Sequence, residues 1–431
     1  MLLMPTAIHA VMPEQTEQTY NLEPLGAGES PYGFFQHPRA PPLIVWRVPV
    51  GCDYSGFFVE VLNFLIGLQS FAGRNNDAIS LDMGKCSEEF LRTLEPEEAD
   101  LIRRLQSNYD ARYGMQNPDW KTTILIHHKL PGTPFSRFEE SNRPKLIIGR
   151  VMTESNILPK AEINFLDDVD YIWVPSSWHK QLYLRHGIDS NRLFVINEPM
   201  SLLPIKNYDL EKKSVGYGES EAKTAYKFLS VFKFEHRKGP DILLKSFWKA
   251  FTTADNVELI IRSYKPSWLP GTNDLNLVFR DFAKKNFNKR LEELPKVTWI
   301  RENLSRKEMF ALYKSVSSFV LPTRGEGWCL PCVEAMACGL PIIVTNYSGP
   351  LSYLNQSFSY PIKVRDILNG DGTAEPDLEE SIRLMRHLYK NRREGERKGA
   401  LARNYVETKL SPHIIAKQIV LKLQEYLSRR L

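Results

Sequence analysis

Two glutamates that could bind a polar ligand, Glu326 and Glu334, stand eight positions apart in the segment GEGWCLPCVEAMACGLP. A glycine flanks Glu326 on each side. Carboxylates accept hydrogen bonds from hydroxyl groups, so two that are held apart can bind two hydroxyl-bearing parts of one ligand. Each acid also has a plainer interpretation, because Glu334 would complement a helix dipole and Glu326 would be a solvated loop residue.

The segments around these acids predict where they lie. Residues 318–321 and 342–345 are short apolar runs typical of buried strands. Pro331 favours the start of a short helix between them, which the Gly-Leu-Pro turn ends. We therefore expect Glu326 in the loop after a strand and Glu334 in the first turn of the helix. Open α/β sheets bind ligands at this carboxyl edge.

A basic loop, in FKFEHRKGPD, is a second candidate for binding a charged ligand. It joins a strand expected at residues 226–233 to a helix expected from Pro240. Lys233, Arg237 and Lys238 gather at the carboxyl end of that strand. Cations beside the N–H groups of a helix N-terminus form a phosphate site. A solvated basic loop is the plainer alternative, but the position in the same domain as the two acids favours phosphate binding.

Together these segments resemble the donor-binding signature of the retaining GT-B glycosyltransferases of glycosyltransferase family 4. EGW, EAMACG and the upstream RKG carry the resemblance, which is strong over residues 226–357 and weak over residues 43–200. It implies an α/β protein of two doubly wound, Rossmann-like domains facing each other across a cleft. It further implies a retaining glycosyltransferase of the hexosyltransferase type, which moves a sugar from a UDP- or GDP-sugar to a glycan, lipid or protein hydroxyl. Neither a metal nor a cofactor is implied.

The resemblance also implies roles for individual residues. Glu326 would hold hydroxyls of the donor sugar, Glu334 would hold the ribose, and Lys238 would neutralise the diphosphate leaving group. Lys233, five places before Lys238, would assist, although the family usually has arginine in that region. Cys329 stands where the family commonly has glycine, which puts the choice of donor in doubt. The other binding residues implied in this half are Arg237, Trp328 and Leu330.

In the amino-terminal half the resemblance implies the acceptor side and part of the donor site. A histidine of ILIHHKLPG would contact the donor sugar, and its spacing to the following Pro-Gly pair favours His128 over His127. Two surface-loop histidines are the alternative. In GRVMTESNILP the matching residues are Arg150 and Glu154. Gly56 would let the backbone approach the donor phosphate.

The length of 431 residues predicts more than one domain. Strand and helix patterns alternate on both sides of a stretch rich in Lys, Glu, Gly and Ser, which favours two parallel sheets. An apolar stripe follows Ser411-Pro412, and the resemblance implies that this terminal helix crosses back to the first domain. We expect an extension without a core over residues 1–40, an acceptor domain over 41–200, a linker over 201–225, a donor domain over 226–410 and the terminal helix over 411–431.

The composition and the cysteines indicate a soluble, cytoplasmic protein. Hydrophobic residues make up 42% and charged residues 25%, as in ordinary globular proteins. No basic segment opens the chain, so we expect no leader peptide. The five cysteines are expected to be reduced thiols. Cys329 and Cys332 form a CxxC motif without a second ligand pair, which favours core cysteines over a zinc site. A redox pair is the other alternative, but no neighbouring sequence feature supports it.

Charged motifs elsewhere have plain interpretations. The net charge of +5 suits anionic ligands or a membrane surface, and we expect no nucleic-acid partner. The basic stretch at residues 386–403 is interpreted as a solvated helical face, with peripheral docking on anionic lipid as the alternative. Asp168 and Asp170 form a DxD motif, but they precede a strand, so we interpret them as a turn and not as a metal site.

Two other functions are compatible with the resemblance. One is a GT-B enzyme of another activity, such as an epimerase or phosphorylase, which no further sequence feature supports. The other is a catalytically inactive protein that binds sugar nucleotides. The presence of Glu326, Glu334 and Lys238 together argues against the inactive protein.

Overall fold

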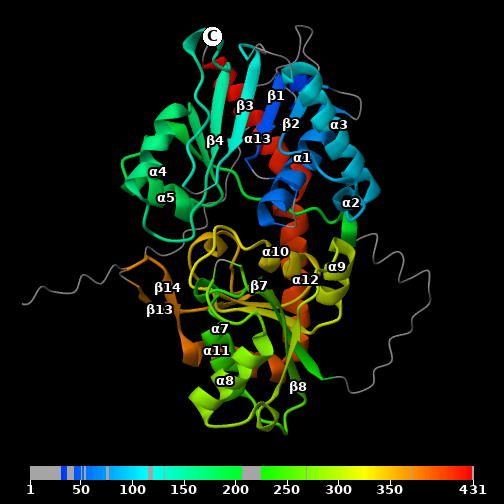
Figure 1. Cartoon of the computed structure of the whole chain (residues 1–431), viewed down its shortest axis with the longest axis vertical. Helices are drawn as coiled ribbons and strands as arrows, with labels where there is room; N and C mark the ends of the chain where they lie inside the picture. The colour runs from blue at the N-terminus through cyan, green and yellow to red at the C-terminus, as the bar shows by residue number, and fades with distance from the viewer. Residues whose placement is uncertain are drawn as a thin grey trace, which may run out of the picture.

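The computed structural model describes two α/β domains, each built on a sheet of six parallel strands with helices packed against it (Figure 1). The described residues are 31–35, 43–49, 51–52, 55–73, 77–114, 120–130, 132–205, 225–267, 269–368 and 370–429. The predicted fold class, two doubly wound Rossmann-like domains, is confirmed. The order of strands in both sheets requires crossovers, which the intervening helices provide.

The amino-terminal sheet has the strand order β2-β1-β3-β4-β5-β6. Its strands are β1 (Leu43–Arg47), β2 (Ile79–Asp82), β3 (Thr123–His128), β4 (Leu146–Arg150), β5 (Tyr171–Val174) and β6 (Leu193–Val195). Its helices are α1 (Gly56–Ala72), α2 (Glu88–Leu91), α3 (Pro96–Tyr113), α4 (Lys160–Phe165) and α5 (Ser177–Arg185). Helices α1 and α3 share a hydrophobic cluster with one face of the sheet, and α5 shares another with the opposite face. Burial on both faces explains why these strands are almost wholly apolar.

The carboxyl-terminal sheet has the order β12-β11-β10-β7-β8-β9. Its strands are β7 (Tyr226–Lys233), β8 (Val257–Tyr264), β9 (Lys296–Ile300), β10 (Ser318–Leu321), β11 (Ile342–Thr345) and β12 (Tyr360–Ile362). A hairpin of β13 (Val364–Ile367) and β14 (Ala374–Pro376) follows. The helices are α7 (Pro240–Ala250), α8 (Leu275–Phe287), α9 (Arg306–Lys314), α10 (Leu330–Ala337), α11 (Leu378–Lys390) and α12 (Arg392–Lys409). Short 3-10 helices are η1 (Pro31–Phe35), η2 (Glu140–Asn142), η3 (Leu166–Asp168), η4 (Ser190–Arg192), η5 (His236–Lys238), η6 (Leu291–Glu293) and η7 (Gly349–Ser352).

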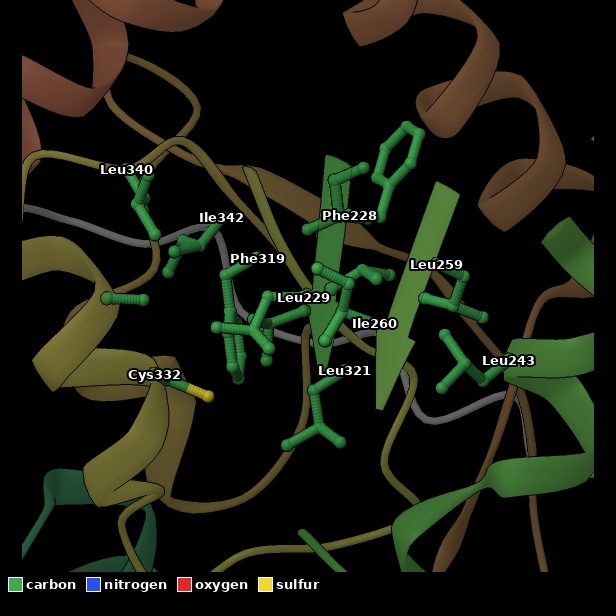
Figure 2. Packing of buried hydrophobic residues seen from close by; sticks show 14 of the residues in the cluster. Phe228, Leu229, Leu243, Leu259, Ile260, Phe319, Leu321, Cys332, Leu340 and Ile342 are labelled. Carbon is green, nitrogen blue, oxygen red and sulfur yellow. The ribbon is translucent and has the colours of Figure 1, made fainter. Parts of the chain in front are cut away.

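Core packing fixes the two helices that follow β7 and β10. Figure 2 shows Phe228 and Leu229 of β7 beside Leu259 of β8, with Leu243 of α7 and Cys332 of α10 reaching the strands from either side. All five side chains belong to one buried cluster. Because α7 and α10 are held by this core, the polar residues at their N-termini are held at one edge of the sheet.

The strands and the short helix around the two glutamates are largely as predicted. The strands expected at residues 226–233, 318–321 and 342–345 coincide with β7, β10 and β11. Helix α10 begins one residue early, at Leu330, and has no acid in its first turn. The prediction that Glu334 lies in the first turn is therefore wrong, because Glu334 is the fifth helical residue.

Helix α13 (Pro412–Ser428) runs from the carboxyl-terminal domain back to the amino-terminal domain and packs on α1 (Figure 1). Its buried side chains belong to the hydrophobic cluster of α1 and α3. Gly67 of α1 permits the close approach, because a Cβ there would lie 2.2 Å from the Pro412 carbonyl oxygen. At the other end, Trp173 Nε1 of β5 donates a hydrogen bond of 3.1 Å to the Tyr426 hydroxyl. The helix thus completes the core of the first domain.

Part of the expected amino-terminal extension is packed. In η1, Phe34 and Phe35 are buried, and the helix contacts α1 and α13. The expectation that residues 1–40 lack a core is therefore wrong for residues 31–35. The rest of that extension and residues 206–224 of the expected linker lie outside the described residues.

Four of the five cysteines are disulfide-bonded, which corrects the expectation of reduced thiols. Cys52 pairs with Cys86, Cys329 pairs with Cys332, and Cys338 is a buried thiol. Cys52 follows β1 and Cys86 follows β2, and these neighbouring parallel strands end at the same edge of the sheet. Their proximity is a consequence of strand order, which spacing in the sequence does not reveal.

No helix among the described residues is long and apolar enough to cross a membrane. In the basic stretch at residues 386–403, several cations have partners within the domain. Arg386 Nη1 donates to the Ala250 carbonyl at 2.8 Å, Lys398 Nζ lies 4.1 Å from the Tyr360 ring centroid, and Arg403 pairs with a glutamate one turn on. These contacts favour the interpretation as a solvated helical face.

Candidate active site

The basic loop and the glutamate loop meet because β7 and β10 are neighbours and both end at the same edge. Lys238 ends η5, and Glu326 lies between β10 and α10. The Lys238 Nζ atom lies 2.8 Å from Oε1 and 2.7 Å from Oε2 of Glu326. The Thr323 hydroxyl donates a further hydrogen bond of 2.9 Å to Oε1. The structure thus places together two residues that are 88 positions apart in the chain.

The Glu326 carboxylate is ionised in this setting. Only 4% of the residue is exposed, and burial alone would raise its pKa. Lys238 and Arg237 outweigh that effect and hold the pKa of Glu326 below its usual value. The backbone of Glu326 is fixed as well, since its N–H donates to the Ser348 hydroxyl at 2.9 Å. This loop therefore presents a pre-positioned anion and cation side by side.

Arg237 links this pair to the amino-terminal domain. Its Nη1 atom donates to the Gly325 carbonyl at 2.6 Å and lies 3.6 Å from Glu326 Oε2. Its Nη2 atom lies 2.9 Å from Glu154 Oε1, in the loop after β4. Lys233, the third cation predicted for this basic loop, is the last residue of β7 and is half-buried. Of the predicted amino-terminal residues, Glu154 thus contacts the carboxyl-terminal site directly.

The glycines beside Glu326 are required because the amino-terminal domain packs too closely for a side chain at either position. A Cβ at Gly325 would lie 2.1 Å from the Glu154 carbonyl oxygen, and one at Gly327 would lie 2.7 Å from the Met152 sulfur. The two loops are therefore in backbone contact. Cys329, the N-cap of α10, has φ of 73°, a left-handed conformation that glycine usually adopts.

Trp328 of the same loop is buried. Its ring packs edge-on against Tyr353 with centroids 5.2 Å apart, and its carbonyl accepts a hydrogen bond of 2.8 Å from the Tyr353 hydroxyl. The indole Nε1 is buried and has no hydrogen-bond partner among the described residues. The structure therefore uses Trp328 to anchor the loop that carries Glu326.

The first residues of two helices are in contact beside this loop. Gly56 is the first residue of α1, and Leu330 is the first residue of α10. A Cβ at Gly56 would lie 3.4 Å from Leu330 Cδ1. Helix N-termini present free N–H groups and a positive dipole end, so two whose first residues meet suit an anion such as a diphosphate.

Glu334, in α10, is half-buried and contacts the hydroxyl of a tyrosine that the sequence does not single out. The Tyr313 hydroxyl of α9 donates to Glu334 Oε2 at 2.8 Å. Burial raises the pKa of Glu334, while Tyr313 and the Arg306 guanidinium oppose that rise. Arg306 in turn pairs with Glu98 of α3 at 2.6 Å, across the domain boundary. Tyr313 belongs to the buried face of α9, and periodicity alone cannot distinguish it from an ordinary core residue.

His128 and Arg150 lie inside the amino-terminal domain beneath α1. Both side chains are fully buried, and both contact Glu60. Arg150 also donates to the Ile196 carbonyl at 2.6 Å, so its guanidinium is engaged within the domain. His127 points to the opposite face of β3, where its Nδ1 accepts from the Ser136 N–H at 3.3 Å. Sequence reasoning missed Glu60, because a single acid in an apolar helix carries no motif.

The DxD motif has structural partners. Asp170 Oδ2 accepts from the Ile147 N–H at 2.7 Å, and Asp170 Oδ1 pairs with Arg143 at 3.1 Å. Asp168 ends η3 and lies 3.4 Å from Arg137. Among the described residues there is no group of three or more acids, histidines or cysteines that could hold a metal ion. These contacts suit the turn that the sequence predicts.

Acid is expected to destabilise the protein through His179, which supports the loop next to Glu154. Its Nδ1 lies 2.6 Å from the Ser176 hydroxyl and its Nε2 lies 2.8 Å from the Thr153 carbonyl. Burial lowers the pKa of His179 from 6.5 to about 3. The unfolded chain therefore binds more protons between these values, and the free energy of unfolding falls as pH drops below about 6.5.

At pH 5 this histidine should cost about 2 kcal/mol relative to neutral pH. Urea unfolding at pH 7 and pH 5 measures the loss. His179→Gln should lose correspondingly less stability between the two pH values. An identical pH dependence in wild type and variant would contradict the assignment.

Comparison with known proteins finds a family model that matches the part of the chain carrying Lys238 and Glu326. Residues 218–398 match the family model described as "Glycosyl transferases group 1". The D-inositol 3-phosphate glycosyltransferase of Mycobacterium sp. (strain KMS) is 23% identical over 283 residues, which cover 64% of this chain and 56% of that protein. The chain thus spans about half the length of the curated relatives that it matches.

Solved structures share the fold across nearly the whole chain. The complex of Anabaena Alr3699/HepE with UDP and glucose aligns with a TM-score of 0.59 at 11% identity, covering 89% of this chain and 100% of that one. Sucrose-phosphate synthase from Thermosynechococcus elongatus aligns with a TM-score of 0.59 at 13% identity, covering 90% and 99%. The chain therefore has a GT-B fold, and residues 218–398 within its carboxyl-terminal half match the glycosyl transferases group 1 model.

Proposed function

We propose that this protein is a glycosyltransferase that moves a sugar from a nucleotide-diphosphate sugar to an acceptor hydroxyl, with retention of configuration and without a metal. The observation that carries the proposal is the part-buried contact of Lys238 with both oxygens of Glu326, in the loop that leads to α10, whose first residue contacts the first residue of α1. Chemically, this arrangement joins a cation for a leaving diphosphate to a carboxylate for sugar hydroxyls. The family match over the same domain supports it.

Charge develops at two places when a glycosidic bond to diphosphate breaks. The departing phosphate becomes more negative, and the sugar becomes oxocarbenium-like. Lys238 and the N–H groups at the start of α10 would stabilise the phosphate. With its lowered pKa, the Glu326 carboxylate stays ionised and accepts hydrogen bonds from the sugar hydroxyls. An acceptor hydroxyl attacking from the face that the phosphate leaves would give retention, with the phosphate taking the proton.

Glu334 would bind the ribose of the donor. Its carboxylate accepts one hydrogen bond from Tyr313, which leaves acceptor capacity for the ribose hydroxyls. The donor would be a UDP- or GDP-sugar, and UDP-glucose is the first to test because one structure with this fold was solved with UDP and glucose. The acceptor hydroxyl, on a glycan, a lipid or a protein, would approach from the amino-terminal domain.

A panel of sugar nucleotides tests the proposal. One nucleotide sugar should raise the melting temperature by several degrees more than the others and should release nucleoside diphosphate when an acceptor is added. Turnover should persist in excess EDTA, since the cations of the site are Lys238 and Arg237. Proton NMR of the product reports the anomeric configuration.

Each part of the proposal can fail separately. Absence of any nucleotide-sugar binding would contradict the function as a whole. Activity that EDTA removes and manganese or magnesium restores would contradict metal independence, and an inverted anomer would contradict retention. Binding without turnover across a broad acceptor panel would favour an inactive sugar-nucleotide-binding protein.

A further inference from the structure

A buried group of charged side chains lies beneath the first turns of α1, next to the candidate site. Glu60 of α1, His128 at the end of β3 and Arg150 at the end of β4 contact one another, and each is at most 1% exposed. Strands β3 and β4 are paired so that His128 and Arg150 are direct neighbours. Phe57, in the first turn of α1, packs edge-on against the His128 ring with centroids 5.4 Å apart.

The two oxygens of Glu60 face different partners. Oε1 accepts from Arg150 Nε at 3.0 Å and from Arg150 Nη2 at 2.8 Å. Oε2 lies 3.2 Å from His128 Nε2. This contact at Nε2 is not an aligned hydrogen bond, and contacts of this kind commonly tighten when a substrate binds.

Glu60 is the ionised acid of this group. Burial opposes its ionisation, but His128 and Arg150 outweigh that effect and lower the pKa of Glu60. Glu198, whose Oε1 lies 3.9 Å from Arg150 Nη2, differs because burial and the Glu60 charge raise its pKa. A protonated Glu198 is neutral, so Glu60 is the carboxylate that balances the positive charge of Arg150. The carboxylate that faces His128 therefore accepts hydrogen bonds and cannot donate one.

A hydrogen-bond acceptor beside Nε2 determines which of the two ring nitrogens of His128 carries the proton. A neutral imidazole carries its proton on the nitrogen that faces the acceptor, and the other nitrogen keeps a lone pair. Both ring nitrogens of His128 are buried without an aligned hydrogen bond to a described residue, although Nε2 has Glu60 Oε2 3.2 Å away. With the proton on Nε2, Nδ1 is a buried acceptor without a partner among the described residues. A buried acceptor without a partner is costly, and a ligand hydroxyl would satisfy it.

We propose that Glu60 is a positioning residue that holds His128 as its Nε2–H tautomer, so that Nδ1 accepts a hydrogen bond from a hydroxyl of the donor sugar. The assignment of the sugar rests on the proposed function, whereas the tautomer does not. Glu60 acts through His128 and does not itself touch the donor. Glu60→Gln tests this, because a glutamine amide can still accept from Arg150 while its NH₂ group donates to Nε2 and moves the proton to Nδ1.

The direct measurement is nitrogen NMR of protein labelled with [15N]histidine, with His128→Asn used to assign the His128 signals. Wild type at neutral pH should show the Nε2–H tautomer, and Glu60→Gln should shift His128 toward Nδ1–H. Wild-type His128 in the Nδ1–H form, or as an imidazolium, would overturn the proposal. This measurement needs no turnover, so it stands even if the protein proves not to transfer sugar.

Kinetics separate positioning from general damage. Glu60→Gln should lower kcat about 10–100-fold, the loss typical when a partner behind a functional histidine is changed. Binding of the nucleoside diphosphate alone should stay near wild type, since it has no sugar hydroxyl. Unchanged kcat in a variant whose tautomer has shifted would overturn the donor contact and leave the tautomer assignment intact.

Asn63→Ala is the matched control. Asn63 is buried one turn further along α1 and donates to the Pro199 carbonyl at 3.0 Å. Its loss should lower stability without moving the His128 proton. A tautomer change in Asn63→Ala as large as that in Glu60→Gln would show that disturbance of α1, and not the Glu60 carboxylate, controls the histidine.

Discussion

Replacing Lys238 with alanine is expected to lower kcat about 10²–10³-fold, the usual cost of losing one electrostatic contact to a developing charge. The change should also destabilise the fold, because it leaves the buried Glu326 carboxylate with Arg237 3.6 Å away as its nearest remaining cation. Turnover must therefore be measured at a temperature where the variant is folded, which circular dichroism establishes.

Two further variants separate the effects on turnover and stability. Lys238→Ala combined with Glu326→Gln should recover stability, since the unpaired buried charge is gone, but should remain inactive. Lys249→Ala, in the helix α7 that follows the basic loop, is the control, because Lys249 is half-exposed and lies 3.9 Å from Glu379 at the surface. Wild-type turnover in folded Lys238→Ala would remove Lys238 from the mechanism.

Ending the chain after Leu410 is expected to unfold the amino-terminal domain. The truncation removes α13, in which Ile415, Ile419, Leu423 and Tyr426 are fully buried. Burial of four such side chains contributes roughly 10 kcal/mol, which is comparable to the total stability of a domain. Calorimetry should show loss of one transition, and turnover should vanish with it. Melting and activity like those of the full chain would contradict this role.

A point variant tests the same interface without removing the helix. Gly67→Ala places a Cβ 2.2 Å from the Pro412 carbonyl, so α1 and α13 must separate. Overpacking of this kind costs about 1–3 kcal/mol, and the melting temperature should fall by several degrees. Gly370→Ala is the control, because a Cβ there meets nothing within 4 Å.

The sequence determined the local elements and the chemistry at their ends. Strands β7, β10 and β11 were predictable because short apolar runs between turn residues have few alternatives. Lys238 and Glu326 stood out because polar residues at a strand-to-helix junction in a parallel sheet must lie at its ligand-binding edge. Their contact with each other depends on the order of the strands, because it requires β7 and β10 to be neighbours in the sheet.

The tertiary structure alone decided the partners of the remaining residues. The Cys52–Cys86 disulfide, the contact of Glu98 with Arg306 and the position of Arg150 beneath α1 all depend on the order of strands or the docking of domains. Hydrophobic periodicity indicates that one face of a helix or strand is buried, but it does not indicate which residues pack against that face. Glu60 illustrates the limit, because one acid in an apolar helix acquires a role only when folding places His128 against it.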